Sequence, residues 1–140
     1  MKDTSILVSG GLLALALSSE VALSADPTPV GVWRDNEKGS VIQIYECEGA
    51  LCAKVVKPYQ AGAKDIKNPK PALRDRPLTG LTFMNGAKRS STNAWKGSLY
   101  NAEDGKNYSG SITLAGNGEL QMQGCAYSIF CQTRVFSRIR

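Results

Sequence analysis

The chain has 140 residues, a formal net charge of +5 and no histidine. The lack of histidine excludes His-based acid–base catalysis, Ser-His-Asp and Cys-His nucleophiles, and His-containing metal sites. The basic residues are scattered and accompany no nucleic-acid-binding motif, so we expect no nucleic-acid partner.

Residues 1–25 have the pattern of an export signal peptide. A weakly basic start precedes an apolar run over residues 6–17, which is too short to span a bilayer as a helix. Small residues follow, and the sequence ALSAD predicts cleavage after Ser24 or Ala25. We therefore expect a periplasmic or secreted protein. Its mature chain, residues 26–140, should form one domain without a transmembrane segment.

The rest of the chain is typical of β-structure, because short alternating runs are separated by turn sequences and no helical period is sustained. Ile42 and Ile44, for example, share one face of such a run. Asp104-Gly105 and Asn117-Gly118 predict hairpins, because Gly and Asn tolerate the positive φ of tight turns. The expected strands lie, in chain order, near residues 30–34, 40–47, 51–57, 81–85, 93–101, 107–115, 119–127 and 129–139.

Eight short antiparallel strands predict an all-β fold, a small closed up-and-down β-barrel. Closure is favoured because it removes the exposed edges of a sheet. A two-sheet sandwich is the structural alternative. An eight-stranded barrel can either fill with side chains or hold one small ligand, and the sequence does not decide between these outcomes.

The four cysteines occur in the sequences CEGALC and CAYSIFC. An even number of cysteines in an exported chain indicates disulfides, with three possible pairings. We favour the local pairs Cys47–Cys52 and Cys125–Cys131, although loop entropy alone does not choose among the pairings. A zinc site built from all four cysteines is the alternative, but the five residues between Cys125 and Cys131 exceed the usual two to four, and export disfavours such a site. We expect neither a metal nor a cofactor.

A proline- and lysine-rich segment, residues 58–77, interrupts the strands and continues into NPKPALRDRPLTG, residues 68–80. Pro69 and the prolines after it exclude a central strand and a helix interior, and they favour extended geometry in the residues before them. The interpretation that we favour is a stiff strap across the barrel rim. Three side chains of this region are expected to hydrogen-bond to the rim: Asp65, Asn68 and Asp75.

A second interpretation gives this segment a binding role. An extended backbone would place Arg74 and Arg76 on one side, where their guanidinium groups could converge on an anionic ligand such as a carboxylate. The two interpretations are compatible, because a loop that covers the mouth of a barrel also lies where ligands enter.

Several characteristic segments occur in order between Gly31 and Arg138: GVW, VIQIYECEGALCAKVV, DIKNPKPALRDRPLTG, WKGSLYNAEDGKNYSGSITL and LQMQGCAYSIFC. Together they resemble the DUF2147 family of bacterial exported proteins, whose function is unknown. The resemblance implies a lipocalin-like β-barrel, a fold that often holds one apolar ligand, although fold does not imply function. The chain departs from the family pattern at NAEDG, at Gly97-Ser98, and at Phe136, where a Trp is usual.

The word GVW is similar to the opening of the first lipocalin strand, where a Trp commonly packs beneath an Arg of the last strand. The resemblance therefore implies a cation–π contact between Trp33 and Arg138 that closes one end of the barrel, with Arg134 as the alternative partner.

We expect the barrel to bind a small apolar or amphipathic molecule, and a ligand with an acidic head group, such as a fatty acid, is one candidate. The candidate ligand-binding residues are Ile44, Phe83, Tyr100, Tyr108, Met122, Arg74 and Arg76. The alternative is a filled barrel whose outer surface meets a protein or envelope partner. We expect no enzymatic activity: Glu103 and Asp104 are adjacent in a turn, whereas the carboxylates of a glycosidase pair face each other across the substrate.

Overall fold

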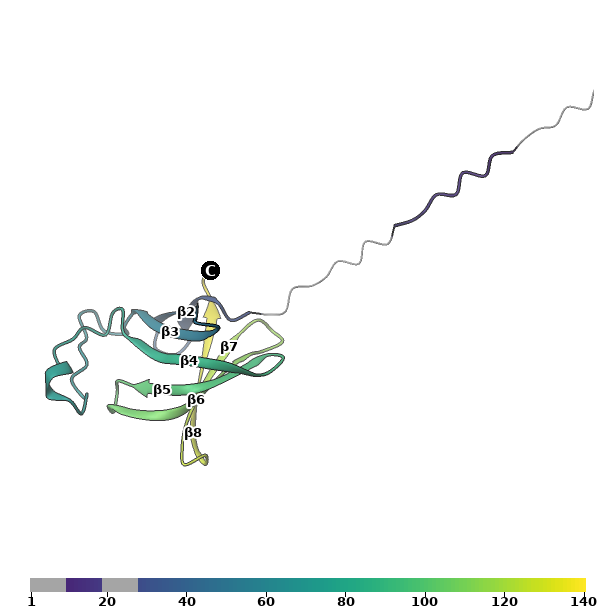
Figure 1. The fold of residues 1–140 in the computed structure, drawn as a ribbon. Coiled ribbons are helices and arrows are strands. Elements are labelled where there is room, and N and C mark those ends of the chain that lie inside the picture. The colour runs from purple at the N-terminus through teal and green to yellow at the C-terminus, as the bar shows by residue number, and fades with distance from the viewer. Residues whose placement is uncertain (1–9, 19–27) are drawn as a thin grey trace, which may run out of the picture.

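The computed structural model describes residues 10–18 and 28–140, and residues 28–140 form a closed antiparallel β-barrel (Figure 1). The strands follow one another around the barrel in chain order, and β1 pairs with β8 to complete it. The all-β barrel expected from the sequence is therefore confirmed over the sandwich. The strands are β1 (Gly31–Asp35), β2 (Val41–Cys47), β3 (Ala50–Lys57), β4 (Thr82–Ser91), β5 (Ala94–Asn101), β6 (Lys106–Leu114), β7 (Leu120–Ala126) and β8 (Phe130–Arg138).

Residues 10–18 form neither a helix nor a strand and lie away from the barrel (Figure 1). The expected cleavage positions, Ser24 and Ala25, fall outside the described residues. Within residues 10–18 and 28–140, no helix is long and apolar enough to cross a membrane.

The barrel has two unlike ends. We call the end that carries the β2–β3, β4–β5 and β6–β7 turns the filled end. We call the other end, which carries the β1–β2, β5–β6 and β7–β8 turns, the open end. The long connection between β3 and β4, residues 58–81, also lies at the open end, and we define it as the strap. It contains the single 3₁₀ turn of the described chain, η1 (Pro71–Leu73).

The core lies toward the filled end, where alternate residues of the strands point inward and meet. Its largest fully buried side chains include Trp33, Ile44, Met84, Ile112 and Leu120. The expected common face of Ile42 and Ile44 is observed, since both are buried, as expected for a strand with one face on the core.

Strand β4 extends six residues beyond its expected end near residue 85, to Ser91. The residue that follows the expected strand is Gly86. In the structure Gly86 has a φ of 77°, and the pairing register with β5 shifts between Asn85 and Lys88. An irregularity of this kind is a β-bulge, which bends a strand without ending it.

Trp33 and Arg138 close the filled end. The Arg138 guanidinium lies 4.3 Å from the centroid of the fully buried indole ring. The same guanidinium donates hydrogen bonds of 2.9 Å to the backbone oxygens of Val30 and Thr28, and the indole Nε1 donates to the Pro29 oxygen at 2.8 Å. The expected partner Arg138 is present above the ring, and Arg134 instead points into the open half of the barrel.

Both local disulfides are confirmed, one at each end of the barrel. Cys47–Cys52 links β2 to β3 at the filled end, and Cys125–Cys131 links β7 to β8 at the open end. Because none of the four cysteines is free, no thiolate remains for the alternative zinc site. Paired cysteines of this kind persist in oxidising compartments, which indicates a non-cytoplasmic protein.

Candidate functional site

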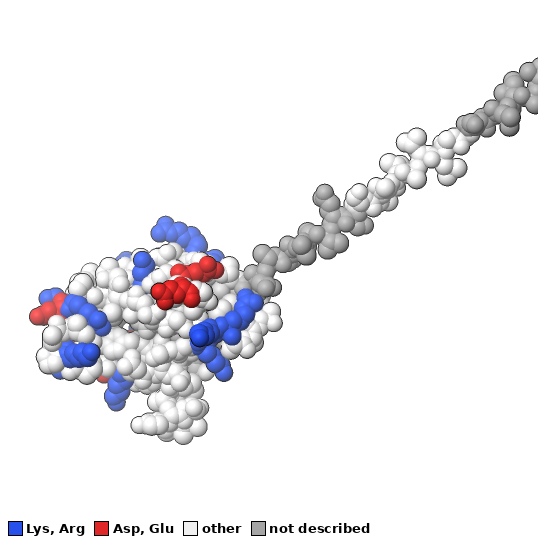
Figure 2. Space-filling view, viewed as in Figure 1, with Lys and Arg blue, Asp and Glu red and all other residues white. Residues whose placement is uncertain are grey.

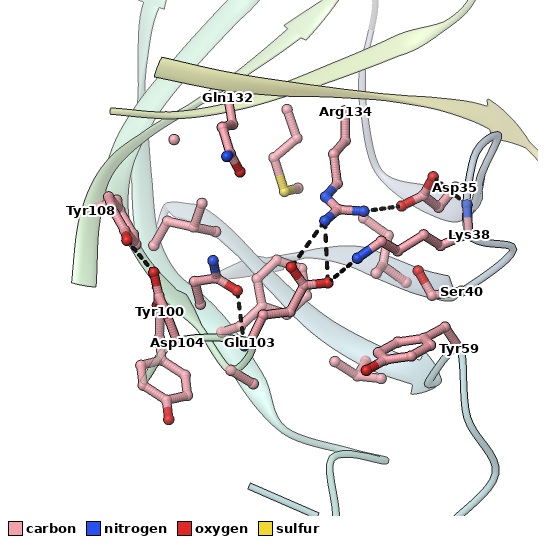
Figure 3. Close-up of a pocket in the computed structure, with 18 of the residues that line it drawn as sticks. Asp35, Lys38, Ser40, Tyr59, Tyr100, Glu103, Asp104, Tyr108, Gln132 and Arg134 are labelled. Atoms are coloured by element: carbon pink, nitrogen blue, oxygen red, sulfur yellow. Dashed lines mark hydrogen bonds and ion pairs between the residues drawn. The ribbon is translucent and has the colours of Figure 1, made fainter. Parts of the chain in front are cut away.

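A cavity of about 540 Å³ occupies the open half of the barrel (Figure 3). Its walls are largely apolar and come from the inward faces of most strands and from the strap. The main apolar lining residues are Ile42, Val55, Phe83, Leu99, Met122 and Phe136. The rim is exposed to solvent, so the cavity is a pocket with a mouth at the open end.

Small inward-facing residues explain why this half is hollow. Along β7, Leu120 and Met122 point inward and are buried toward the filled end, but the next inward positions are Gly124 and Ala126. Where the inward positions hold large side chains, the interior packs solid, and where they hold small ones, it leaves space.

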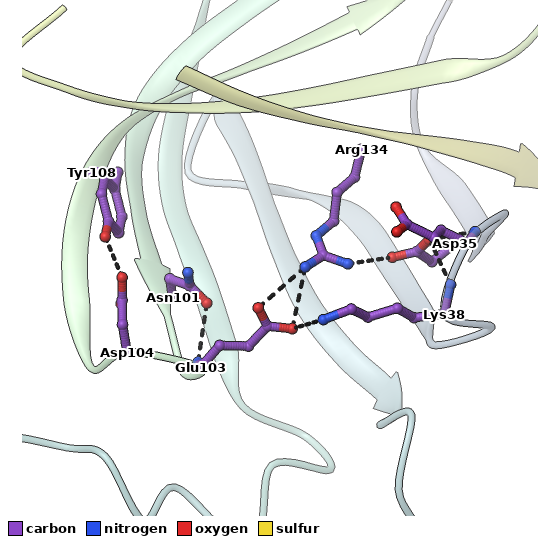
Figure 4. A network of polar contacts seen from close by, with 8 residues as sticks. Asp35, Lys38, Asn101, Glu103, Asp104, Tyr108 and Arg134 are labelled. Carbon is purple, nitrogen blue, oxygen red and sulfur yellow. Dashed lines mark hydrogen bonds and ion pairs between the residues drawn. The ribbon is translucent and has the colours of Figure 1, made fainter. Parts of the chain in front are cut away.

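One wall of the pocket is charged, and Arg134 is at its centre (Figures 3 and 4). Arg134 lies two residues before Phe136 on β8, so it takes the next inward position. Its guanidinium binds the Asp35 carboxylate at 3.2 Å and both oxygens of Glu103 at 3.1 and 3.2 Å. Lys38 also forms an ion pair with Glu103.

Asp35 fixes the turn that carries Lys38. It is almost fully buried, and its second oxygen accepts hydrogen bonds from the backbone N–H groups of Glu37 at 2.8 Å and Lys38 at 3.1 Å. Such a side-chain-to-backbone bond is a common way for Asp to hold a turn. The Lys38 ammonium also lies 5.3 Å from the centroid of the Tyr59 ring, which comes from the strap.

Tyr108 and Asp104 form a second polar contact at the rim. The Tyr108 hydroxyl donates a hydrogen bond to the Asp104 carboxylate (Figure 4). This bond, together with burial and the nearby negative charge, raises the pKa of Tyr108. The phenol is therefore neutral at physiological pH.

The charged groups that line the pocket nearly cancel. Asp35, Glu103 and Asp104 bring three negative charges, and Lys38 and Arg134 bring two positive charges. Both cations are already paired with protein carboxylates. A ligand carboxylate would therefore have to displace Glu103 from Arg134. A head group that donates and accepts hydrogen bonds could use the existing arrangement.

The strap is fastened to the barrel through Asp65, whose side chain is fully buried. Its carboxylate accepts hydrogen bonds from the Tyr100 hydroxyl at 2.6 Å, from Asn68 Nδ2 at 2.8 Å and from Arg76 Nε at 2.8 Å. Burial raises the pKa of Asp65, but these three hydrogen bonds and the charge of Arg76 outweigh it, so the pKa lies below its ordinary value of 3.8. Burial and the bond to Asp65 raise the pKa of Tyr100 to about 12.

The strap also crosses closely over the β5–β6 turn. Gly105, at a φ of 73°, is buried, and a Cβ at this position would lie 1.9 Å from the Lys67 backbone oxygen. Glycine is therefore required here both by the backbone conformation and by the passing chain. Together with the Asp65 contacts, this approach fixes the strap over the rim.

The arginines of the strap do not converge on the pocket, which corrects the binding interpretation. The backbone is not extended between them, because η1 is followed by Arg74 in a helical conformation. Arg74 Nε donates to the Asn68 backbone oxygen at 2.8 Å, and Arg76 binds Asp65. Neither arginine is among the lining residues. Asp75 is exposed and makes no hydrogen bond to the described residues, so it does not fasten the strap as expected.

Of the other expected ligand-binding residues, Phe83, Tyr100, Tyr108 and Met122 line the pocket. Ile44 does not, because it is fully buried in the core toward the filled end. Pro69 is exposed on the strap just before η1.

The charged wall is not among the features expected from the sequence. Arg134 is expected there only as the alternative partner of Trp33, Glu103 only as a turn residue beside Asp104, and neither Asp35 nor Lys38 is singled out. The two-residue period of β8 could have indicated that Arg134 points into the barrel, since Gln132, Arg134 and Phe136 share the inward face. Among the described residues, no group of three or more acidic or cysteine side chains could hold a metal ion.

A closed eight-stranded barrel with a pocket at one end and an Arg over a Trp at the other is a lipocalin-like protein. The chain belongs to the family described as uncharacterized protein conserved in bacteria (DUF2147), which matches residues 31–138. The chain is also similar to protein HP1028 from the human pathogen Helicobacter pylori, which is described as belonging to the lipocalin family. The two are 25% identical, with a TM-score of 0.71 over 79% of this chain and 82% of that one. The comparison with curated proteins found no match.

Proposed function

We propose that the protein binds a small amphipathic molecule, with the apolar body of the ligand inside the barrel and its polar head at the charged wall. The observation that carries this proposal is the pocket itself, whose volume of about 540 Å³ lies within the range of small-molecule sites, roughly 300–1,000 Å³. Its mainly apolar lining with a few convergent polar groups is also typical of such sites. The cavity weighs against the alternative of a filled barrel.

The charges around the pocket favour a neutral or zwitterionic head group over a simple acid. Arg134 and Lys38 offer donors, while Glu103 offers acceptors, and these groups already neutralise one another. A fatty acid would bring one more negative charge to a lining whose net charge is already −1. An alcohol or monoglyceride brings hydrogen bonds without that charge, so we expect it to bind at least as tightly as the acid of the same chain length.

Mass spectrometry under native conditions tests the proposal on protein purified from its own host. We expect a stoichiometric adduct of amphiphile mass that organic solvent removes. Displacement of a fluorescent fatty-acid analogue then ranks the acid, the alcohol and the monoglyceride of one chain length.

A pocket-filling variant supplies the specificity control. Ala126→Leu extends a side chain into the cavity, and we expect it to lose ligand uptake. Gln121→Leu makes a similar change on the exposed face of the same strand and should bind as the wild type does. The proposal fails if the wild type takes up none of these amphiphiles, or if Ala126→Leu takes them up unchanged.

We also propose that the protein works outside the cytoplasm, in the periplasm or after secretion. The two disulfides support this, because disulfides are rare in reducing compartments. Labelling of free thiols in rapidly quenched cells, followed by mass spectrometry, measures the oxidised fraction directly. A mainly reduced protein in its own host would contradict the proposal.

A further inference from the structure

The exposed apolar side chains of the barrel are gathered at one end. Within residues 28–140, the exposed large hydrophobic residues at the open end are Val56, Tyr59, Ile66, Tyr127, Ile129 and Phe130. Ile139 lies at the filled end and is the one exception among these residues. An exposed apolar cluster of this kind marks a surface that meets another apolar phase or a partner.

The β7–β8 hairpin is the most prominent part of this cluster. Tyr127 is 88% exposed, Ile129 75% and Phe130 68%. The hairpin projects from the barrel without any charged side chain (Figure 2), and no charged residue occurs between Glu119 and Arg134. The Cys125–Cys131 disulfide holds the base of this projection.

The backbone of the tip holds one large aromatic side chain, Tyr127, in a strained conformation. Tyr127 and Ser128 have φ values of 53° and 63°, a left-handed conformation that hairpins usually give to Gly or Asn. The β5–β6 and β6–β7 hairpins have Gly105 and Gly118 at positive φ, and the β2–β3 turn has Glu48 and Gly49. A strained aromatic residue at an exposed tip, where glycine would avoid the strain, points to a use for its side chain.

The strap supplies a basic surface at the same open end of the barrel. It carries five basic and two acidic residues, and Asp65 is buried against Arg76. The remaining exposed cations are Lys64, Lys67, Lys70 and Arg74. The acidic rim residues Glu103 and Asp104 are already engaged with Lys38, Arg134 and Tyr108.

We propose that the open end docks on an anionic lipid surface. The tip residues Tyr127, Ile129 and Phe130 enter the interfacial region of the bilayer, and the lysines of the strap bind the phosphates of the head groups. An uncharged projection and a basic segment at the same end of the barrel fit a bilayer, since lipid offers an apolar interior beneath a charged surface. Phe130 of the hairpin and Tyr59 of the strap both line the mouth of the pocket, so docking would place the cavity directly over the lipid.

Co-sedimentation with vesicles tests this proposal, using the full mature barrel with phosphatidylcholine alone or mixed with phosphatidylglycerol. We expect binding to the mixed vesicles that weakens as salt is raised. Ile129→Ser with Phe130→Ser should weaken this binding by about tenfold or more. Lys64→Gln with Lys67→Gln and Lys70→Gln should remove the preference for phosphatidylglycerol.

Two control variants distinguish docking through the open end from binding by any exposed apolar side chain and from ligand uptake in the pocket. Ile139→Ser removes an exposed apolar side chain at the filled end and should bind vesicles as the wild type does. Ala126→Leu, which fills the pocket, should also bind them normally, so a failure of ligand uptake and a failure of docking are distinguishable. Because Ile129 and Phe130 are exposed, their replacement should leave the melting temperature unchanged.

Three results would overturn the proposal. The first is no sedimentation of the wild type with either vesicle. The second is equal vesicle binding by the tip variant and the wild type. The third is a lipid-free oligomer that the tip variant dissociates, because that would assign the hairpin to a second copy of the chain.

Discussion

The inward-facing strand positions hold different kinds of side chain at the two ends of the barrel. At the filled end, inward residues are large and apolar, and Trp33, Ile44 and Leu120 are fully buried. At the open end, inward residues include Gly124 and the charged Arg134. Each fully buried large side chain contributes about 1.5–3 kcal/mol relative to exposure, whereas a buried ion pair often adds little net stability. The filled end therefore stabilises a scaffold whose open end is free to vary in chemistry.

The largest expected effect is at the filled end, with Trp33→Ala. This change removes the buried indole, its hydrogen bond to Pro29 and the ring beneath Arg138. We expect the free energy of unfolding to fall by about 3–5 kcal/mol, measured by urea denaturation.

Tyr59→Ala at the open end is the matched control. Tyr59 is also aromatic but is 52% exposed at the mouth, so we expect a change within about 0.5 kcal/mol. Equal losses for the two variants would contradict the assignment of stability to the filled end.

The strap offers an intermediate effect through Asp65→Asn. The substitution keeps the size of the side chain but removes the charge that binds Arg76. A broken buried pair costs about 3–5 kcal/mol, but Arg76 is partly exposed, so we expect about 2 kcal/mol at neutral pH. Asp75→Asn, an exposed neutral-for-acid change on the same strap, should have almost no effect.

The difference in the free energy of unfolding between wild type and Asp65→Asn should depend on pH. The pKa of Asp65 is lower in the folded protein than its ordinary value of 3.8. The stability that its charge contributes is therefore present above about pH 4 and is lost as the pH falls through the lowered folded-state pKa. Urea titrations near pH 7 and near pH 3 should show the gap between wild type and Asp65→Asn narrowing in acid. A gap that stays constant would mean that the carboxylate charge is not what fastens the strap.

The fold could be predicted because its determinants are local. Alternation in β2 and β7 and the glycine turns at Gly105 and Gly118 specify strands and hairpins from neighbouring residues alone. The end of β4 could not be predicted in this way, since Gly86 has the same local appearance in a bulge as in a turn. Only its pairing with β5 distinguishes the two.

The site was harder to predict because it depends on which strands face one another. Asp35, Glu103 and Arg134 come from three separate parts of the chain and meet only when the barrel closes. Arg74 and Arg76 are conspicuous in the sequence, but a short 3₁₀ turn directs them to the Asn68 backbone and to Asp65. The charged wall of the pocket therefore forms only when the barrel closes, and the two arginines of the strap make structural contacts within the strap.

The smallest expected effect is at the tip of the β7–β8 hairpin at the open end. The β6–β7 hairpin at the filled end serves as its comparison. Ser128 has a φ of 63°, which costs a residue with a Cβ roughly 1 kcal/mol, and Gly avoids that cost but has more freedom to lose on folding. We expect Ser128→Gly to raise the free energy of unfolding by about 0.5 kcal/mol, seen as a higher urea midpoint with an unchanged slope.

The β6–β7 hairpin provides the reverse experiment. Gly118 has a φ of 83°, and a Cβ there would meet no neighbouring atom. Gly118→Ala should therefore lose about 1 kcal/mol through backbone conformation alone. If the open-end tip is kept for its apolar side chains, Ser128→Gly gains stability without changing vesicle binding, because Tyr127, Ile129 and Phe130 remain. A loss of stability in Ser128→Gly would instead show that the tip is already suited to its turn, and the strain argument for its function would fail.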